Sequence, residues 1–251
     1  MKNLTTIITA IFLLTSITTA QNYSLSFDGE NDYVDAGMSS SLIMNHITVS
    51  AWIKPDWDGA HDYVISRELG YVLKKESGDI FHFVVYVNGV EYRANTTVPP
   101  ANEWSHVAGS YDGETVRLFV DGVEVASNED PNGNLQVDES SSVLIGSTSC
   151  CDDRLYKGII DEVAIWNVAL TDTEIQSNYN TELIGNEEGL VGYWNFNEGT
   201  GTTLNDQTSN DNNGTIYGAT WSTDVPPIET SPSEHIVITN DSLVVLEDSS
   251  S

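Results

Sequence analysis

Basic residues are scarce in this chain of 251 residues. It contains nine lysines and arginines against 38 aspartates and glutamates, which gives a formal net charge of −29 at neutral pH. A surface of that charge repels phosphate backbones and anionic lipid head groups. The composition therefore argues against nucleic acid as a partner. It suits divalent cations, or simply solubility in salty surroundings.

Long apolar runs are also missing, apart from one at the start. Residues 1–20 combine a positive start at Lys2, a threonine-containing apolar stretch, and small residues at Thr18 and Ala20. That order is typical of a secretory signal peptide, and the stretch is short and polar for a bilayer span. We expect cleavage before Gln21, a secreted or cell-surface location, and no stable membrane insertion of the mature chain. An uncleaved N-terminal anchor is the alternative.

Cysteine is limited to two neighbours, Cys150 and Cys151, in the stretch STSCCDD. Zinc prefers four well-spaced ligands, so an adjacent pair alone does not predict a metal site. An exported chain meets oxidising surroundings, in which thiols tend to form disulfides. Adjacent Cα atoms are about 3.8 Å apart, below the usual disulfide span of about 4.4–6.8 Å, so a bond here would close a strained ring. Two interpretations remain: a vicinal disulfide forming a rigid apolar knob that could stack on a ligand, or thiols that stay reduced or pair between chains.

Short apolar runs, separated by glycine and small polar residues, make up most of the remainder, and neither heptads nor strand–helix alternation is present. This pattern predicts an all-β sandwich. We expect strands in the segments NYSLSFDG, ITVSAWIKP, IFHFVVYVNGVEY, WSHVAGSYDG, TVRLFVDGVEVAS and SVLIGS, and again in GLVGYWNFNEG and NNGTIYGATWS.

Three Asn-Gly or Asp-Gly pairs predict two-residue hairpin turns, because glycine accepts the positive φ that such turns need. They are Asn88-Gly89, Asp112-Gly113 and Asp121-Gly122. The last two lie nine residues apart, which predicts a meander of three successive strands.

One short helix is expected over residues 172–179. Thr171 and Glu174 have the spacing of a capping box, and Leu170 and Ile175 occupy the positions of a hydrophobic staple. We expect this helix to cover one end of the sandwich.

The composition divides the chain into three parts. Residues 1–20 form the signal peptide and residues 21–225 form one β-rich domain. Residues 226–251 begin with PPIETSPSEH, whose proline and serine content is typical of a linker. The remaining residues, to Ser251, are the start of a further module or a disordered tail.

The segment KGIIDEVAIWN carries a carboxylate within an apolar pattern. Strict alternation places Asp161 on one face with Ile159, Val163 and Ile165, and Glu162 on the other face. An unpaired carboxylate on a core face would cost several kcal/mol, and few basic residues are present to pair with it. We expect Asp161 either to bind a hard cation such as calcium or to accept hydrogen bonds from backbone amides.

The segment SFDGENDYVD supplies further oxygen atoms for such an ion. Asp28 ends a predicted strand, and Gly29 lets its own carbonyl approach closely because it has no side chain. Asp32 and Asp35 add carboxylates nearby. Calcium accepts several oxygen ligands in flexible geometry. The alternative for Asp28-Gly29 is an ordinary turn.

Taken in order, these segments resemble the laminin G-like jelly-roll domain of the concanavalin A-like lectin/glucanase group. The resemblance runs from Tyr23 to about Tyr179. It is carried by YSLSFDGENDYVDAG, ITVSAWIKP, EWSHVAGSYDGETVRLFVDGVEVA, SVLIGS and YKGIIDEVAIWNVALTDTEI.

The resemblance implies two packed antiparallel sheets in a jelly-roll sandwich. It also implies a structural calcium ion near the FDG and IDEV segments, where Asp28, Gly29 and Asp161 stand. The strands after the helix resemble a pair that often precedes FDG in such domains, and here we expect them to complete the same sandwich.

Catalytic motifs are missing. The E-x-D-x-x-E pattern of glucan-hydrolysing relatives, the sialidase repeat and the G-x-S-x-G elbow are all absent from the sequence. Asp161 and Glu162 are expected to point to opposite faces, and the histidines show no H-E-x-x-H spacing. We therefore predict that the chain is not an enzyme.

Binding is the function that remains. Sugar sites favour exposed aromatic side chains beside polar groups, and Trp57 lies in the loop-like stretch PDWDGAHDY near His61 and Tyr63. With Cys150 and Cys151, these are the candidate ligand-binding residues. A Trp57 side chain folded back onto the sandwich is the alternative.

The sequence thus predicts a lectin-like, carbohydrate-binding module, stabilised by calcium and part of a larger extracellular protein. Its partner would be a glycan or an extracellular polysaccharide. The alternative is a protein-binding, adhesion or spacer module of the same fold without a sugar site.

Overall fold

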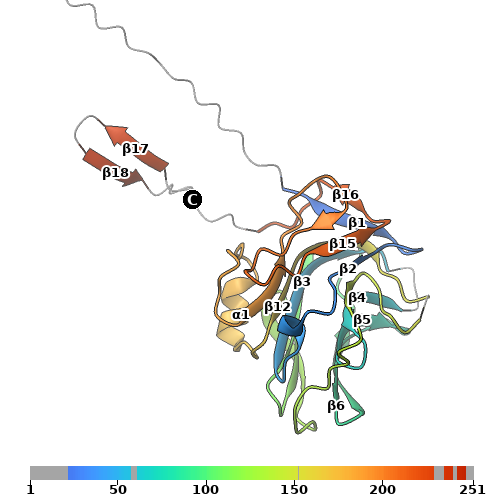
Figure 1. Cartoon of the computed structure of the whole chain (residues 1–251). Coiled ribbons are helices and arrows are strands. Elements are labelled where there is room, and N and C mark those ends of the chain that lie inside the picture. Colours follow the sequence, from blue (N-terminus) through green and yellow to red (C-terminus); the bar gives the residue numbers. More distant parts are fainter. Residues whose placement is uncertain (1–21, 58–60, 152, 229–234, 240–241, 247–251) are drawn as a thin grey trace, which may run out of the picture.

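The computed structural model describes residues 22–57, 61–151 and 153–228, together with the backbone of residues 235–239 and 242–246. The main body is two eight-stranded antiparallel sheets, packed as a sandwich (Figure 1). The all-β, two-sheet fold with one α-helix is therefore confirmed among the described residues. The predicted signal peptide lies outside them.

The first sheet contains the strands β1 (Ser24–Asp28), β3 (Ile47–Pro55), β8 (Ser105–Tyr111), β9 (Val116–Val120), β10 (Val123–Asn128), β12 (Lys157–Trp166), β13 (Leu190–Trp194) and β16 (Thr220–Ser222). Their order is β10-β9-β8-β3-β12-β1-β16, with β13 beside β12. The predicted meander is confirmed as the neighbours β8, β9 and β10.

The second sheet contains the strands β2 (Tyr33–Asp35), β4 (Asp62–Arg67), β5 (Tyr71–Glu76), β6 (Ile80–Val87), β7 (Val90–Thr97), β11 (Val143–Ile145), β14 (Thr203–Leu204) and β15 (Gly214–Tyr217). Their order is β14-β15-β2-β11-β4-β5-β6-β7. The late strands β13, β15 and β16 thus pair with early strands and complete the same sandwich.

Smaller elements complete the description. A 3-10 turn, η1 (Ser40–Leu42), lies between β2 and β3, and the hairpin of β17 (His235–Thr239) and β18 (Ser242–Leu246) forms a two-stranded sheet of its own. No helix within the described part of the chain is long and apolar enough to span a bilayer.

Two of the three predicted hairpin turns are confirmed. Asn88-Gly89 and Asp121-Gly122 each connect adjacent strands with positive φ at both residues. The prediction for Asp112-Gly113 is wrong, because four residues separate Tyr111 from its partner Val116. The cause is the Asp112 carboxylate, whose Oδ1 accepts the backbone N–H groups of residues 114 and 115 at 2.9 and 2.8 Å and holds a wider turn.

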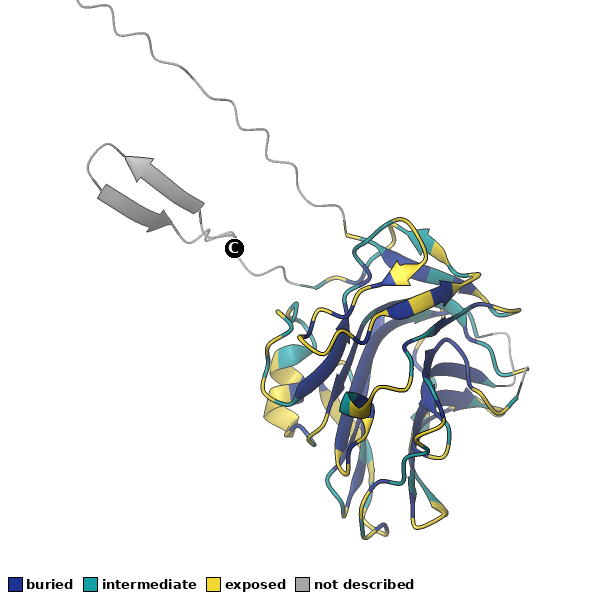
Figure 2. Cartoon of the chain, viewed as in Figure 1, coloured by how far each residue is buried: buried dark blue, intermediate teal, exposed yellow. Residues whose placement is uncertain are grey.

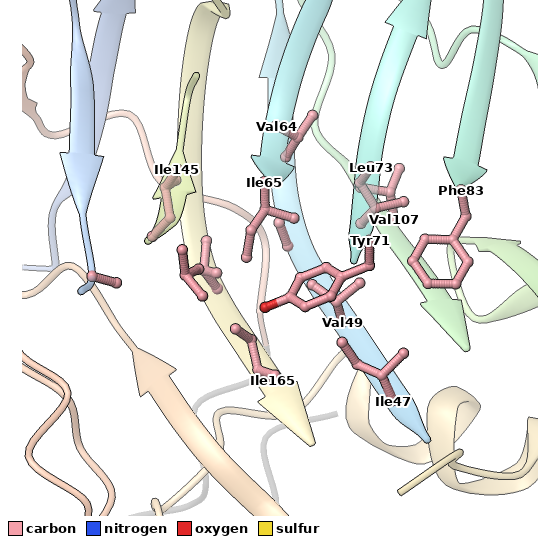
Figure 3. Close-up of a cluster of buried hydrophobic side chains, with 14 of the residues drawn as sticks. Ile47, Val49, Val64, Ile65, Tyr71, Leu73, Phe83, Val107, Ile145 and Ile165 are labelled. Atoms are coloured by element: carbon pink, nitrogen blue, oxygen red, sulfur yellow. The ribbon is translucent and has the colours of Figure 1, made fainter. Parts of the chain in front are cut away.

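The core lies between the two sheets and is filled by the inward side chains of both. Figure 3 shows Ile47, Val49 and Val107 of the first sheet opposite Tyr71 and Phe83 of the second, all of them fully buried. Figure 2 shows the same division, with the strand interiors buried and the loops exposed.

The helix α1 (Asp172–Asn178) begins with the predicted capping box of Thr171 and Glu174, which is confirmed. Its buried residue Ile175 joins Leu170 in a second apolar cluster, which includes Trp166 and Tyr193 of the first sheet. The helix therefore covers the outer face of that sheet beside β3 and β12, and not an end of the sandwich as expected (Figure 1).

The alternation predicted for β12 is wrong. Ile160, Val163 and Ile165 face the core, and Ile159 does not. The register against β3 shifts between Asp161 and Ala164, and Glu162 has φ of 51°. These are the features of a β-bulge, which inserts one extra residue and reverses the facing of the residues after it. Asp161 consequently pairs with Trp52 on the outer face of the sheet.

Gly109 of β8 offers a test of the core. A Cβ atom there would lie 2.1 Å from Cγ of Phe83 on the opposite sheet. Overpacking a filled core costs about 1–3 kcal/mol, so we expect Gly109→Ala to lower the free energy of unfolding by that amount in urea denaturation.

The neighbouring variant Ser110→Ala is the matched control. The Ser110 hydroxyl is buried without a hydrogen-bond partner among the described residues, so its removal should be neutral or slightly stabilising. Equal stability of Gly109→Ala and the wild type would contradict the packing of β8 against β6.

Candidate functional site

The outer face of the second sheet carries a loop that joins β11 to β12. Ser66 of β4 donates a hydrogen bond to the carbonyl of Ser147 at 2.8 Å, and Thr148 donates to Glu68 at 3.3 Å. These contacts lay the start of the cysteine-containing segment against β4. The loop thereby becomes one wall of a surface pocket.

We call this pocket the Tyr63 pocket. It has a volume of about 240 Å³ and opens on the outer side of β4, β5, β6 and β7. The residues that line it are Tyr63, Glu68, Leu69, Val72, Lys74, Glu76, Tyr86, Glu91, Arg93, Cys150 and Arg154. Its floor is apolar, because Tyr63, Val72 and Val84 form a buried cluster with Tyr86 against it.

A chain of charged hydrogen bonds crosses the pocket. The Lys74 ammonium lies 2.6 Å from Glu76 Oε1, and Arg93 Nη1 lies 2.7 Å from Glu76 Oε2. The Nε of Arg93 also donates to Glu91, which accepts the Tyr86 hydroxyl at 2.8 Å. These side chains therefore hold one another in fixed positions, which is what a preorganised polar site requires.

The pKa of the Glu76 carboxyl reflects this network. Burial alone would raise it, but the hydrogen bonds and charges of Lys74 and Arg93 outweigh burial and lower the pKa to about 2. The pKa of Glu91 is lowered as well, since its bonds to Arg93 and Tyr86 outweigh burial in the same way. Both carboxylates are therefore ionised at neutral pH.

Tyr63 is the meeting point of two cations. Its hydroxyl accepts a hydrogen bond from Arg154 Nη1 at 2.7 Å and from the Lys74 ammonium at 3.5 Å. The same two groups stand 5.7 and 5.3 Å from the ring centroid, within the range of cation–π attraction. The ring thus anchors the loop residue Arg154 to the sheet.

The two cysteines stand on a ridge between two pockets. Cys150 lines the Tyr63 pocket, and Cys151 lines a larger neighbouring hollow of about 730 Å³ that is rich in serine side chains. Their Sγ atoms lie 2.7 Å apart and are not bonded to each other in this structure. Burial, followed by the hydrogen bond with Cys151, raises the pKa of the Cys150 thiol to about 11. The vicinal disulfide stays a prediction.

The predicted aromatic ligand residue lies elsewhere. Trp57 packs against Phe81 and Tyr156 at centroid distances of 6.2 and 6.1 Å, and its indole N–H donates to the carbonyl of Pro99. It is therefore folded back onto the core, and it does not line the Tyr63 pocket. His61 does not line the pocket either. Of the five predicted ligand residues, Tyr63 and Cys150 meet in one pocket, with Cys151 at its rim.

The predicted calcium ligands do not come together. Asp28 pairs with Lys157 in the β1–β12 ladder, four residues before Asp161. At about 3.3 Å per residue, the two aspartates are roughly 13 Å apart along the sheet. Asp28 caps its own turn instead, accepting the backbone N–H of Glu30 at 2.8 Å beside Gly29. Asp28-Gly29 and Asp161 thus belong to two different places.

Asp161 lies in a small acidic cavity under the C-terminal end of the domain. Asp161, Glu162 and Glu182 line it with the amides Asn22 and Asn197, and its volume of about 20 Å³ holds one water-sized particle. The β-bulge turns both neighbours toward this cavity, so the expectation that they point to opposite faces is wrong. Burial, followed by the charge of Glu162, raises the pKa of Asp161 well above its usual range.

The donor chemistry of this cavity suits a hard cation, because carboxylate and amide oxygens are calcium's preferred ligands and no described lining residue is basic. Among the described residues, however, no three His, Cys, Asp or Glu side chains are already gathered in positions that could hold a metal ion. An ion would have to draw the carboxylates together.

Most of the polar residues of the Tyr63 pocket are not predicted from the sequence, namely Glu68, Lys74, Glu76, Tyr86, Glu91, Arg93 and Arg154. The sequence does contain one signal that points to these residues. Basic residues are rare in this chain, and three of the nine lysines and arginines line this single pocket.

Comparison with known proteins agrees with the fold. A family model described as the concanavalin A-like lectin/glucanases superfamily matches residues 28–176. The structure resembles that of a carbohydrate-binding protein, so described provisionally, from Bacteroides ovatus, with a TM-score of 0.69 and 23% sequence identity, over 84% of this chain and 62% of that one.

Two further similarities are more limited. A sialidase module from Ruminococcus gnavus, solved with α2,3-sialyllactose, matches with a TM-score of 0.52 and 13% identity, over 64% of this chain and all of that one. Pappalysin-1 of Homo sapiens is 31% identical over 81 residues, which are 32% of this chain and only 5% of that protein.

The Glu76 network predicts a pH dependence of stability. The folded pKa of about 2 lies below the usual value of 4.5, so its contribution is complete above about pH 4.5 and is lost as the pH falls toward 2. We expect Glu76→Gln to cost about 2 kcal/mol at pH 7, and the difference from wild type to shrink steadily below pH 4.5.

Urea denaturation between pH 3 and pH 7 measures this difference. Glu103→Gln, at an exposed position, is the control and should follow the wild type throughout. A Glu76→Gln deficit that stays constant over this pH range would show that the charge network does not exist.

Proposed function

Since the chain belongs to the concanavalin A-like lectin/glucanases superfamily, we propose that it is a lectin-like, carbohydrate-binding module and that its sugar site is the Tyr63 pocket. The observation that carries the proposal is the pocket itself, with an apolar tyrosine floor and a ring of fixed charged side chains. Sugars are bound by such a combination, since their C–H faces pack on aromatic rings and their hydroxyls need oriented polar partners.

The relatives support this proposal at the level of the fold. The Bacteroides ovatus protein is described as carbohydrate binding, and the Ruminococcus gnavus module was solved with a bound glycan. We extend the proposal to an extracellular location, where the chain would serve as one module of a larger protein with a glycan or polysaccharide as its partner.

The charges in the pocket favour binding over hydrolysis. A glycosidase needs one carboxylic acid with a raised pKa to protonate the leaving group. The pKa values of Glu76 and Glu91 are instead lowered, because Lys74 and Arg93 hold both groups ionised. These carboxylates can accept hydrogen bonds from sugar hydroxyls, and neither can act as the acid.

A glycan array tests the proposed function, with isothermal titration of the best ligand. We expect Tyr86→Ala to weaken binding about tenfold or more, because it removes part of the aromatic floor and one bond to Glu91. Tyr217→Ala is the control: it is an exposed tyrosine at the other end of the same sheet, and its loss should leave affinity unchanged.

Two results would contradict the proposal. If no glycan on the array binds, the proposed sugar site is wrong, and a protein-binding or spacer module is favoured. A loss of binding in Tyr217→Ala, with Tyr86→Ala unaffected, would move the site to the opposite end of the sheet.

Calcium stabilisation is a separate proposal, and it now concerns Asp161 with Glu162 and Glu182. A bound cation would relieve the repulsion that buried Asp161 experiences from the two partly exposed glutamates. We expect EDTA to lower the Tm, by roughly 5–10 °C when free calcium had been about a hundredfold above its Kd. Asp161→Asn should lose this sensitivity to EDTA, and Asp28→Asn should keep it. If EDTA leaves the Tm of the wild type unchanged, the proposal that calcium stabilises the domain is wrong.

A further inference from the structure

Nearly every basic side chain of this acidic protein has an acidic partner. Of the eight lysines and arginines that the structure describes, six lie within 4.0 Å of an Asp or Glu oxygen. They are Lys54, Lys74, Lys75, Arg93, Arg117 and Lys157. The seventh, Arg67, is fully buried and donates to the carbonyl of Leu42 at 2.7 Å.

Arg154 is the exception. Among the described residues its guanidinium contacts only neutral groups, the hydroxyl and ring of Tyr63 and the sulfur of Cys150. It is partly exposed and lines the Tyr63 pocket. Guanidinium has five N–H donors in a planar fork that matches a carboxylate or sulfate. One of its nitrogens, Nη1, holds Tyr63, so the fork is fixed in place with donors to spare.

We propose that the pocket recognises an acidic sugar, whose carboxylate or sulfate group binds Arg154. This inference rests on the proposed function and names the class of glycan. An arginine with no ionic partner in the described part of the structure is unusual in a chain with 38 acidic residues. A charge-assisted hydrogen bond from a ligand anion would supply the partner, and such bonds are about twice as strong as neutral ones.

The acidic residues of the pocket are compatible with an anion. Glu76 pairs with both Lys74 and Arg93, and Glu91 pairs with Arg93, so the charges of both carboxylates are compensated. Glu68 has no basic partner at 4.0 Å among the described residues and accepts only from the Thr148 hydroxyl. It stands at the rim, where the Tyr63 pocket meets the serine-lined hollow. Glu68 would repel an anion weakly, so removing its charge should strengthen binding of an anionic ligand.

The test uses matched pairs of glycans that differ only in charge. The pairs are polygalacturonate and the same polymer with its carboxyl groups reduced to alcohols, sialyllactose and lactose, and dextran sulfate and dextran. We expect the anionic member of at least one pair to bind at least about tenfold more tightly, with an advantage that falls as salt rises.

Three variants of the full chain test whether the positive charge of Arg154 is the one that binds the anionic glycan. Arg154→Gln should weaken binding of the preferred anionic glycan about tenfold to a hundredfold. It should weaken binding of the neutral partner by a clearly smaller factor, which reflects only the lost hydrogen bond to Tyr63. Glu68→Gln should tighten the anionic glycan. Arg117→Gln removes the same charge from the other sheet and should change neither. Circular dichroism melts confirm that each variant is folded.

The outcomes separate the inference from the function on which it rests. Equal or tighter binding of the neutral member in every pair overturns the acidic-sugar inference, while the glycan site stands. Equal weakening by Arg154→Gln and Arg117→Gln also overturns it, because the effect would then be one of overall charge. No binding to any of the six glycans overturns the inference, and the glycan array decides the proposed function independently.

Discussion

The face-to-face packing of the two sheets is the constraint on which the rest of the molecule depends. Each inner face is apolar, and the contact is so close that only glycine fits opposite Phe83 at position 109. Because one face of each eight-stranded sheet packs in this core, only the outer faces are left for other contacts. The first sheet covers its outer face with α1 and the second apolar cluster. The second sheet leaves its outer face open around the Tyr63 pocket.

The Tyr63 pocket on this open face is built by contacts between residues that are distant in the sequence. Arg154 and Tyr63 are 91 residues apart in sequence, and their hydrogen bond fixes the cysteine-containing loop at the edge of the pocket. The network of Lys74, Glu76 and Arg93 then joins β5 to β7 across the intervening strand β6 and holds its charges in place. Three of the eight described lysines and arginines line this pocket in a chain of net charge −29, so we expect an anionic ligand to bind here rather than elsewhere on the described surface.

Local features of the sequence predicted the fold well. Strand alternation located β3 over Ile47–Pro55, and the capping box located α1. The predictions that were wrong concern features that depend on contacts between residues distant in the sequence. The bulge at Glu162 depends on how β12 pairs with β3, and periodicity alone cannot show an extra residue. The position of Trp57 depends on partners such as Tyr156, about a hundred residues away. The Tyr63 pocket combines side chains from four strands and two loops, so only Tyr63 and Cys150 of its lining were predicted from the sequence.

The central claim is that the outer face of β4–β7, at the Tyr63 pocket, is where this lectin-like domain holds its glycan. Amide chemical-shift mapping by NMR, in a titration with the tightest-binding glycan, tests it most directly. We expect the largest shifts on residues 63–76, 84–93 and 148–154, and no change in the amides of α1 and of β8–β10. Shifts centred on α1, or on the acidic cavity at Asp161, would contradict it.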